Sequence, residues 1–256
     1  MPEKQQNAFA EWGSFMHSIF ERFYKGQLDF YDICDEYENN YKNKVRLAFP
    51  YNKWTDLGKK YYEAGLEALE YFNDLPDNIE ILDIECKINT MINGITFVGF
   101  ADLILRKQDT NEIIIVDHKS KAKFASKSEQ RKYARQLYLY AVYVKEKYGA
   151  YPSILAFNMF RVGDVVTIPF SESDLEEAKQ WFSNTVSNIY MDSEFLDKIE
   201  IVYRKSEKDI EDFSKQDFFC NELCGVRAYC NRSSFAERHA DDYRQKNHRK
   251  GKKKTE

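Results

Sequence analysis

Two short segments bring acidic and basic side chains together: 99-GFAD-102 and, fifteen residues after its aspartate, 117-DHKS-120. Both lie in runs of β-branched and aromatic residues, which are typical of strands. Side chains alternate between the two faces of a strand, so Asp117 and Lys119 must point the same way. A carboxylate beside an ammonium can bind a metal ion, orient a water molecule or stabilise the charge of a phosphate.

The turn between the first two strands sets their register. Asn93-Gly94 is typical of a two-residue hairpin turn. With that turn, counting back along both strands places Glu85 directly opposite Asp102. Opposed side chains lie about 4.5–5.5 Å apart at Cβ, where like charges destabilise a sheet.

The link to the next strand, 107-KQDTNE-112, predicts a four-residue loop whose flanking residues pair. Asp102 then falls opposite Asp117, and Glu85 completes a row of acids across three strands. A divalent cation such as Mg²⁺ or Mn²⁺, which prefers carboxylate and water oxygens, would neutralise that row. The alternatives are a shifted register or acids on a solvated face.

Other polar residues lie on helices that could reach the same place. His17 lies at the edge of the apolar stripe of a helix predicted over residues 7–25, where a histidine is more often structural than a ligand. An imidazole ligand would shift the metal preference toward Mn²⁺. Gln136 and Tyr140 lie one turn apart on a helix predicted over 126–148, a spacing that also suits helix packing.

A basic stretch follows the second segment. It comprises Lys121, Lys123, Lys127, Arg131, Lys132 and Arg135. Such a stretch fits a nucleic-acid backbone or a solvated helix face. The chain carries a net charge of −4, of which the tail 244–256, with seven Lys or Arg and one Glu, contributes +6 and the remainder −10. We expect the tail to be disordered.

The cysteines suggest a second metal site. Five cysteines, an odd number, argue against a disulfide framework and for a reducing, cytoplasmic compartment. Cys220, Cys224 and Cys230 form a group that suits an iron–sulfur cluster or zinc, with Cys34 as the candidate fourth ligand. Cys86 is expected in the core. No apolar run reaches the length of about 18 residues that a membrane span needs.

The order of the elements predicts an α/β fold with a mixed sheet covered by helices. Strands are expected over 81–92, 95–105, 113–119, 153–162 and 165–170, and a last helix over 171–190. By domain, we expect an N-terminal helical region over 1–75, a core over 76–205, a cysteine-bearing segment over 206–235 and the basic tail over 244–256.

In combination, these motifs resemble a known family. His17, Glu85, the GFAD aspartate, 117-DHK-119 and 136-QLYLY-140 are similar to the RecB-like branch of the PD-(D/E)XK nuclease superfamily. That branch includes the AddB nuclease domain and the CRISPR-associated RecB-type exonucleases. The resemblance spans about residues 10–230 and implies a three-layer α/β/α, restriction-endonuclease-like core.

The resemblance also implies roles for the motif residues. His17, Asp102, Asp117 and the main-chain carbonyl of His118 would bind Mg²⁺ or Mn²⁺, Lys119 would assist the attacking water, Gln136 and Tyr140 would support the site and the DNA, and Glu85 would be an additional acid. The implied activity is hydrolysis of DNA, as an exonuclease on single strands or duplex ends, in recombination, repair or mobile-element processing. A helicase or recombination protein is the expected partner.

Iron–sulfur members of this branch carry one cysteine ahead of the histidine motif and three near the C-terminus. The C-terminal three match here, except that the first gap has three residues instead of two. For the upstream ligand of a [4Fe-4S] cluster, either Cys34 substitutes, or its segment is absent from this sequence, or no cluster forms. The rival interpretations are a non-catalytic DNA-binding subunit that kept the fold and an interaction module organised by a cysteine-bound metal.

Overall fold

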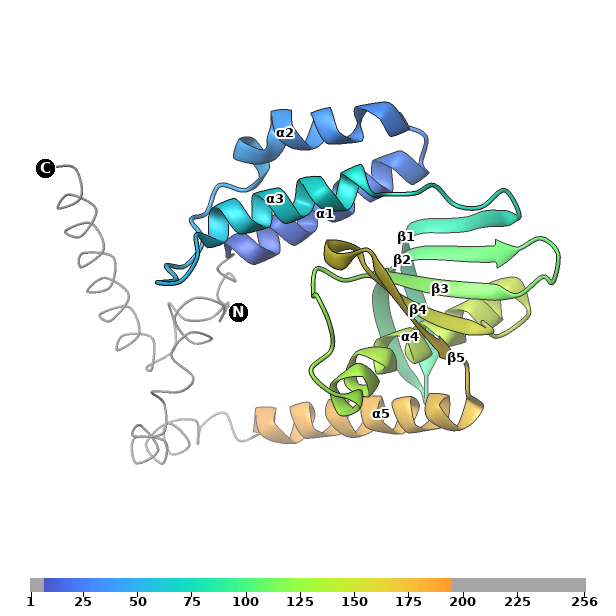
Figure 1. The fold of residues 1–256 in the computed structure, drawn as a ribbon. Coiled ribbons are helices and arrows are strands. Elements are labelled where there is room, and N and C mark those ends of the chain that lie inside the picture. Colours follow the sequence, from blue (N-terminus) through green and yellow to red (C-terminus); the bar gives the residue numbers. More distant parts are fainter. Residues whose placement is uncertain (1–6, 195–256) are drawn as a thin grey trace, which may run out of the picture. The chain divides into compact units, whose positions relative to one another are not determined.

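The computed structural model describes residues 7–194 of the 256-residue chain. In chain order the elements are α1 (Ala8–Tyr24), η1 (Phe30–Asp32), α2 (Ile33–Lys44), α3 (Leu57–Glu70), β1 (Ile79–Ile92), β2 (Ile95–Lys107), β3 (Ile113–His118), α4 (Lys127–Tyr148), β4 (Ile154–Met159), η2 (Phe160–Val162), β5 (Asp164–Pro169) and α5 (Glu172–Glu194), as Figure 1 shows. The predicted order of helices, strand meander, helix, strands and helix is confirmed. Within the described residues, none of the helices has the length and apolar character to cross a membrane.

The described residues divide into two compact units. The larger contains residues 12–45 and 58–190, and the smaller contains residues 7–11, 46–57 and 191–194 of the described range. In the smaller unit, the carboxylate of Glu11 accepts hydrogen bonds from the backbone N–H groups of Arg46 at 2.9 Å and Leu47 at 2.8 Å. The larger unit holds the sheet and all the motif residues up to Tyr140.

A five-stranded mixed sheet forms the centre of the larger unit. Its strand order is β1-β2-β3-β4-β5. Strands β3 and β4 pair in parallel and the other neighbours are antiparallel. A parallel pair needs a crossover connection, and here α4 makes it. The predicted α/β fold class with a mixed sheet flanked by helices is therefore confirmed.

The register of β1 against β2 is the predicted one. Asn93 and Gly94 have φ values of 50° and 76°, the left-handed conformation that a type I′ turn requires. Counting back from the turn, the pairing stays in step as far as Asp83 opposite Ile104, and a bulge shifts it between Ile81 and Asp83. Glu85 and Asp102 are therefore opposed, at the predicted positions.

The register of β2 against β3 is confirmed as well. The backbone N–H of Lys107 donates to the carbonyl of Glu112 at 2.9 Å, which closes the predicted loop. Leu103 then pairs with Val116. The next positions in this register are Asp102 and Asp117, so the three acids follow one another across neighbouring strands.

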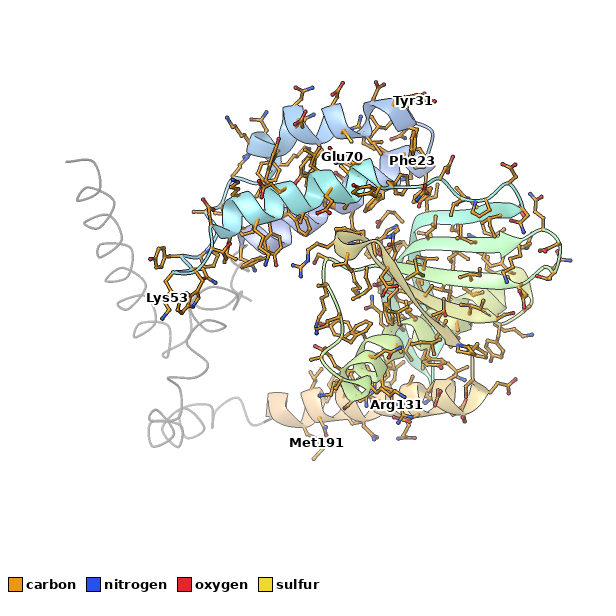
Figure 2. The ribbon with its side chains drawn as sticks, in the orientation of Figure 1. Phe23, Tyr31, Lys53, Glu70, Arg131 and Met191 are labelled. Atoms are coloured by element: carbon orange, nitrogen blue, oxygen red, sulfur yellow. The ribbon has the colours of Figure 1, made fainter. Side chains whose placement is uncertain are left out.

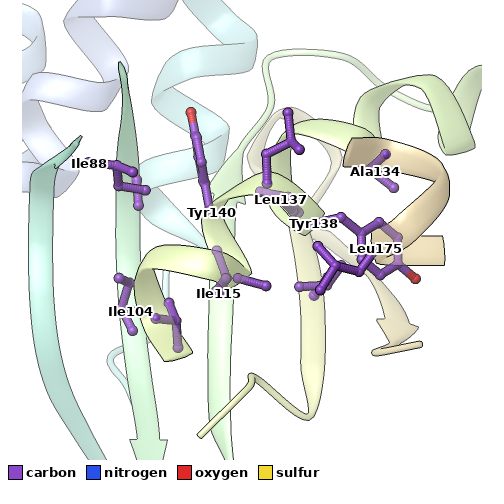
Figure 3. Close-up of a cluster of buried hydrophobic side chains, with 14 of the residues drawn as sticks. Ile88, Ile104, Ile115, Ala134, Leu137, Tyr138, Tyr140 and Leu175 are labelled. Atoms are coloured by element: carbon purple, nitrogen blue, oxygen red, sulfur yellow. The ribbon is translucent and has the colours of Figure 1, made fainter. Parts of the chain in front are cut away.

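Helix α4 packs across the sheet and encloses the main core. It begins after Ser126, whose hydroxyl accepts from the N–H of Glu129, and ends at Gly149, which has a φ of 80°. Its buried side chains meet those of the strands and of α5, as Figure 3 shows for Leu137, Ile104, Ile115 and Leu175. Burial of this apolar area is the main force that holds the sheet and α4 together.

The helices before the sheet pack through a buried tyrosine. Tyr37 of α2 is fully buried; its hydroxyl accepts from the indole N–H of Trp12 and donates to the carbonyl of Tyr62, both at 3.0 Å. Gly65 permits this approach, because a Cβ there would lie 2.2 Å from the Tyr37 hydroxyl oxygen. Helix α1 also reaches the end of β3, where the ring of Phe20 lies 5.0 Å from that of His118.

One strand boundary was predicted wrongly. The strand expected over 153–162 ends at Met159, and residues 160–162 form the 3₁₀ helix η2. Gly163, with a φ of 63°, follows it directly and turns the chain into β5. The apolar run of Met159 and Phe160 masked this break in the sequence, because both residues are buried in either conformation.

Candidate active site

Three ligand-type side chains converge from three different elements. The Nδ1 atom of His17 on α1 lies 3.7 Å from Oε1 of Glu85 on β1 and 3.6 Å from Oδ2 of Asp102 on β2. One ligand atom from each of the three lies within 4.8 Å of the others. Imidazole nitrogen and carboxylate oxygen form a donor set that suits Mn²⁺ and, through the oxygens, Mg²⁺.

A local bend in β1 brings Glu85 to this place. Asp83 bonds to Lys147 of α4, and Thr90 bonds to Glu146 of the same helix. These two strand residues are seven positions apart, an odd number, so a regular strand would direct them to opposite faces. The strand therefore changes face between them, and Glu85 has the left-handed φ of 48° that permits the change. Left-handed backbone at a residue other than glycine is typical of functional positions.

The backbone of His118 joins the histidine to the acids. Its carbonyl lies 3.0 Å from Nε2 of His17, and its N–H donates to Oδ2 of Asp102 at 2.6 Å. Because a carbonyl can only accept, Nε2 of His17 carries a hydrogen. In a neutral imidazole the Nδ1 atom then has a free lone pair, and this atom is the one that faces Glu85 and Asp102. The predicted role of the His118 carbonyl as a metal ligand stays a prediction.

Asp117 and Lys119 form an ion pair beside this group. Lys119 Nζ lies 2.5 Å from Asp117 Oδ2, and their side chains are only 19% and 7% exposed. The ammonium also lies 5.5 Å from the centre of the Tyr133 ring. The predicted metal set was His17, Asp102 and Asp117, whereas the residues that converge most closely are His17, Glu85 and Asp102.

Burial and mutual repulsion make ionisation of the acids unfavourable. Burial raises the pKa of Asp102 to about 6; the neighbouring charge of His17 opposes this rise and that of Asp117 adds to it. Burial also raises the pKa of Asp117, although the Lys119 ammonium opposes the rise. Burial tends to lower the pKa of His17, but the neighbouring carboxylates of Glu85, Asp102 and Asp117 outweigh it and the pKa is raised. A bound divalent cation would remove this penalty, so the residues fit such an ion.

The glutamine–tyrosine motif closes the site from α4. Gln136 donates to the hydroxyl of Tyr140. The Tyr140 ring lies on Gly99, where a Cβ would stand 2.6 Å from its Cε1 atom. The close packing of the Tyr140 ring against the strand therefore requires a glycine at position 99. Burial raises the pKa of Tyr140, and the charges of Asp117 and Asp102 contribute to the rise.

Comparison with protein families supports the interpretation of this geometry. The model of the PD-(D/E)XK nuclease superfamily matches residues 1–231. The chain belongs to this superfamily. Among curated proteins, no match was found. Nucleases of this superfamily generally use divalent metals to cleave nucleic acid, and the converging acids and His17 provide a candidate metal site.

One residue that shapes the nuclease site, Asn158, was not predicted from the sequence. Asn158 of β4 pairs with His118 of β3 in the parallel register. Its Nδ2 atom lies 3.0 Å from Nδ1 of His118, and its carbonyl accepts from the N–H of Lys119 at 2.8 Å. Burial lowers the pKa of His118 to about 3, so this imidazole is neutral and can accept the amide hydrogen. A single asparagine inside an apolar strand was the only available signal.

The predicted basic stretch separates into bound and free residues. Lys121 pairs with Glu129 at 2.6 Å, and Arg135 lies over the Trp181 ring, 5.1 Å from its centre. The remaining four, Lys123, Lys127, Arg131 and Lys132, are exposed; Figure 2 shows Arg131 on α4. The exposed four remain candidates for nucleic-acid contacts, while Arg135 also serves to pack α5 against α4.

Three of the four cysteines of the predicted cluster lie outside the residues that the structure describes. Cys220, Cys224 and Cys230, like the basic tail, lie outside the described residues, so a [4Fe-4S] cluster in this nuclease stays a prediction. Cys34 is half-buried on α2. Cys86 is half-buried against the main core, as expected, and burial raises the pKa of its thiol to about 11.

Proposed function

We propose that this protein is a Mg²⁺- or Mn²⁺-dependent deoxyribonuclease of the RecB-like type, acting as an exonuclease in recombination, repair or mobile-element processing. The observation that carries the proposal is the convergence of His17, Glu85 and Asp102 within 4.8 Å beside the buried Asp117–Lys119 pair. Three neighbouring carboxylates with a single ammonium to balance them lower the stability of the fold. Their presence together therefore favours a functional role for this group.

The three converging side chains would hold the cation. His17 is prepared for this role, because the His118 carbonyl fixes its hydrogen on Nε2 and leaves Nδ1 free. Asp102 is held in place by the His118 N–H. When bound, the cation supplies Lewis-acid polarisation of the scissile phosphate and lowers the pKa of the attacking water.

Lys119 would act on the reacting atoms directly. Its ammonium is fixed by Asp117 and by the Tyr133 ring in a site that is mostly shielded from solvent. An ammonium there can donate a hydrogen bond to the attacking water, or stabilise the negative charge that develops on the phosphate. Asp117 would keep Lys119 aligned and share in binding the cation as the phosphate arrives. Gln136 presents its exposed amide beside the site, where it can contact the DNA backbone.

The decisive experiment compares cleavage by the wild-type chain with that of Lys119→Ala and Asp117→Ala. Removing a group that stabilises transition-state charge typically lowers kcat by about 10²–10³-fold. Labelled single-stranded and duplex DNA would be incubated with Mn²⁺ or Mg²⁺, and EDTA should stop the reaction. Lys60→Ala is the matched control, because Lys60 is an exposed lysine of α3 outside the site. Full cleavage by either site variant, with wild-type activity present, contradicts the assignment.

Two substrate comparisons test the finer parts of the proposal. An exonuclease should degrade linear strands and leave circular single-stranded DNA intact, whereas an endonuclease would cut both. RNA of the same sequence tests the restriction to DNA. Binding of DNA without cleavage under any metal condition would instead indicate a non-catalytic DNA-binding subunit.

A further inference from the structure

The outer face of the β1–β2 hairpin exposes three large apolar side chains. Met91 is 55% exposed, Val98 54% and Phe100 56%. Their neighbours on the inner face, Ile88 and Ile92 among them, are fully buried against α4. The exposure is thus a property of one face of the hairpin and not of a frayed strand.

Six residues form this face, which we name the hairpin platform: Lys87, Asn89, Met91, Thr96, Val98 and Phe100. They are three directly opposed pairs, of which Lys87 with Phe100 is the pair farthest from the turn. All six are exposed, and none is acidic. An aromatic ring and an ammonium therefore stand side by side at one end of the platform.

That end of the platform leads into the candidate active site. On β2 the position two residues beyond Phe100 in the same row is Asp102, and on β1 Glu85 lies two residues from Lys87, at the bend. Two residues along a strand span about 6–7 Å. This distance is close to the spacing of neighbouring nucleotides in an extended strand, so a chain that has its phosphate at the acids would have its next unit over Phe100.

We propose that the hairpin platform binds the unpaired nucleotides next to the scissile phosphate, with Phe100 stacking on a base and Lys87 contacting a phosphate. The proposal rests on the proposed function and adds a preference for single-stranded nucleic acid. Aromatic rings beside cationic groups are the usual means of holding single strands without sequence preference, and the bases of an intact duplex are not available for stacking. A second protein copy fits this face poorly, because stable interfaces need about 20–30 residues a side and a more apolar centre.

The test measures binding of a short labelled single-stranded oligonucleotide to the full-length chain. It is done in the Lys119→Ala background with Mg²⁺, or in EDTA if that variant still cleaves. Loss of one stacked base should raise Kd about 5- to 150-fold in Phe100→Ala. Phe100→Leu should lose affinity as well, and Phe100→Trp should retain it, because stacking needs an aromatic ring. Lys87→Ala should reduce the slope of log K against log salt by about 0.7.

Two controls separate this effect from general damage. Tyr31→Ala removes another exposed aromatic residue, which lies on η1 (Figure 2), and should bind as the parent chain does. Affinity for a blunt duplex should not depend on Phe100. Thermal unfolding of each variant would show that the fold is retained, as expected for a side chain that is mostly exposed.

The outcomes distinguish the platform from the nuclease assignment. Unchanged single-strand affinity in Phe100→Ala, equal loss for duplex and single strand, or full affinity in Phe100→Leu would each overturn the platform. A change in oligomeric state in Phe100→Ala with unchanged DNA affinity would also overturn it and identify the face as a protein interface. If the affinity changes follow the prediction but no metal condition gives cleavage, the platform stands and the proposed function fails.

Discussion

Replacing Asp102 by Asn should stabilise the protein when no metal is bound. Burial and neighbouring charge raise the pKa of this carboxyl from its ordinary value of 3.8 to about 6 in the folded protein. The folded protein thus retains a proton that the unfolded chain releases, and its stability falls as the pH rises from about 4 to 6. The shift of about two pKa units corresponds to about 3 kcal/mol at pH 7. Asn avoids this cost and can still accept the N–H of His118.

The expected effect has a defined pH dependence. In EDTA, Asp102→Asn should exceed the wild-type free energy of unfolding by less than about 1 kcal/mol at pH 4 and by about 3 kcal/mol at pH 7. For a chain of this size the latter corresponds to roughly 6–12 °C in Tm. His17, whose pKa is also raised, loses its stabilising charge as the pH rises through its folded pKa, so wild-type stability falls further above about 6.5.

Urea unfolding followed by circular dichroism between pH 4 and 8 measures both quantities. Mg²⁺ at about 1,000 times its Kd should reverse the order, because it stabilises the wild type by about 4.1 kcal/mol, more than the variant gains, and the variant has lost a ligand oxygen. Asp77→Asn, at an exposed acid outside the site, should show no such pH-dependent gain. If Asp102→Asn is no more stable than wild type at pH 7 in EDTA, burial of the Asp102 carboxylate is not as unfavourable as the structure indicates.

Three further substitutions test the surroundings of the site. Asn158→Ala leaves the buried His118 imidazole without its partner and should weaken Mn²⁺ binding about 10- to 100-fold, as measured by the metal dependence of Tm. Gly99→Ala forces the Tyr140 ring aside and should lower the free energy of unfolding by about 1–3 kcal/mol, with a parallel loss of cleavage. Arg135→Ala should lower Tm more than Arg131→Ala, because only Arg135 packs against α5.

The strand register could be predicted because the turns fix it. Asn93-Gly94 requires left-handed backbone that few other sequences provide, and a two-residue turn leaves one pairing. The alternation of side chains then carries that pairing from the turn as far as Asp83 opposite Ile104, beyond which the register shifts. Both steps are local, so the opposition of Glu85 and Asp102 follows from residues close to them in sequence.

The grouping of the side chains could not be predicted in the same way. Register placed Asp117 in the row of acids, but whether its carboxylate meets Lys119 or the other acids depends on rotamers and on the Tyr133 ring from α4. The packing of Arg135 against Trp181 depends on how α4 and α5 lie against each other, which no local pattern encodes. The same holds for Asn158, which reaches His118 only through a crossover connection.

The bend at Glu85 could not be predicted because a left-handed backbone is expected at glycine and not at glutamate. A φ of 48° costs a residue with a Cβ about 1–2 kcal/mol, so a sequence shaped by folding alone would place Gly here.

Glu85→Gly and Glu85→Ala both remove the carboxylate, and they differ only in backbone preference. In a regular strand Gly is less stable than Ala by about 0.5–1 kcal/mol. At this bend the order should reverse, with Glu85→Gly more stable by about 1 kcal/mol in urea unfolding. If Glu85→Ala is the more stable, the strand is regular in solution and the acid does not reach Asp102 through strained backbone. If the order reverses, the glutamate is retained at a cost to stability, which only a role in the site explains.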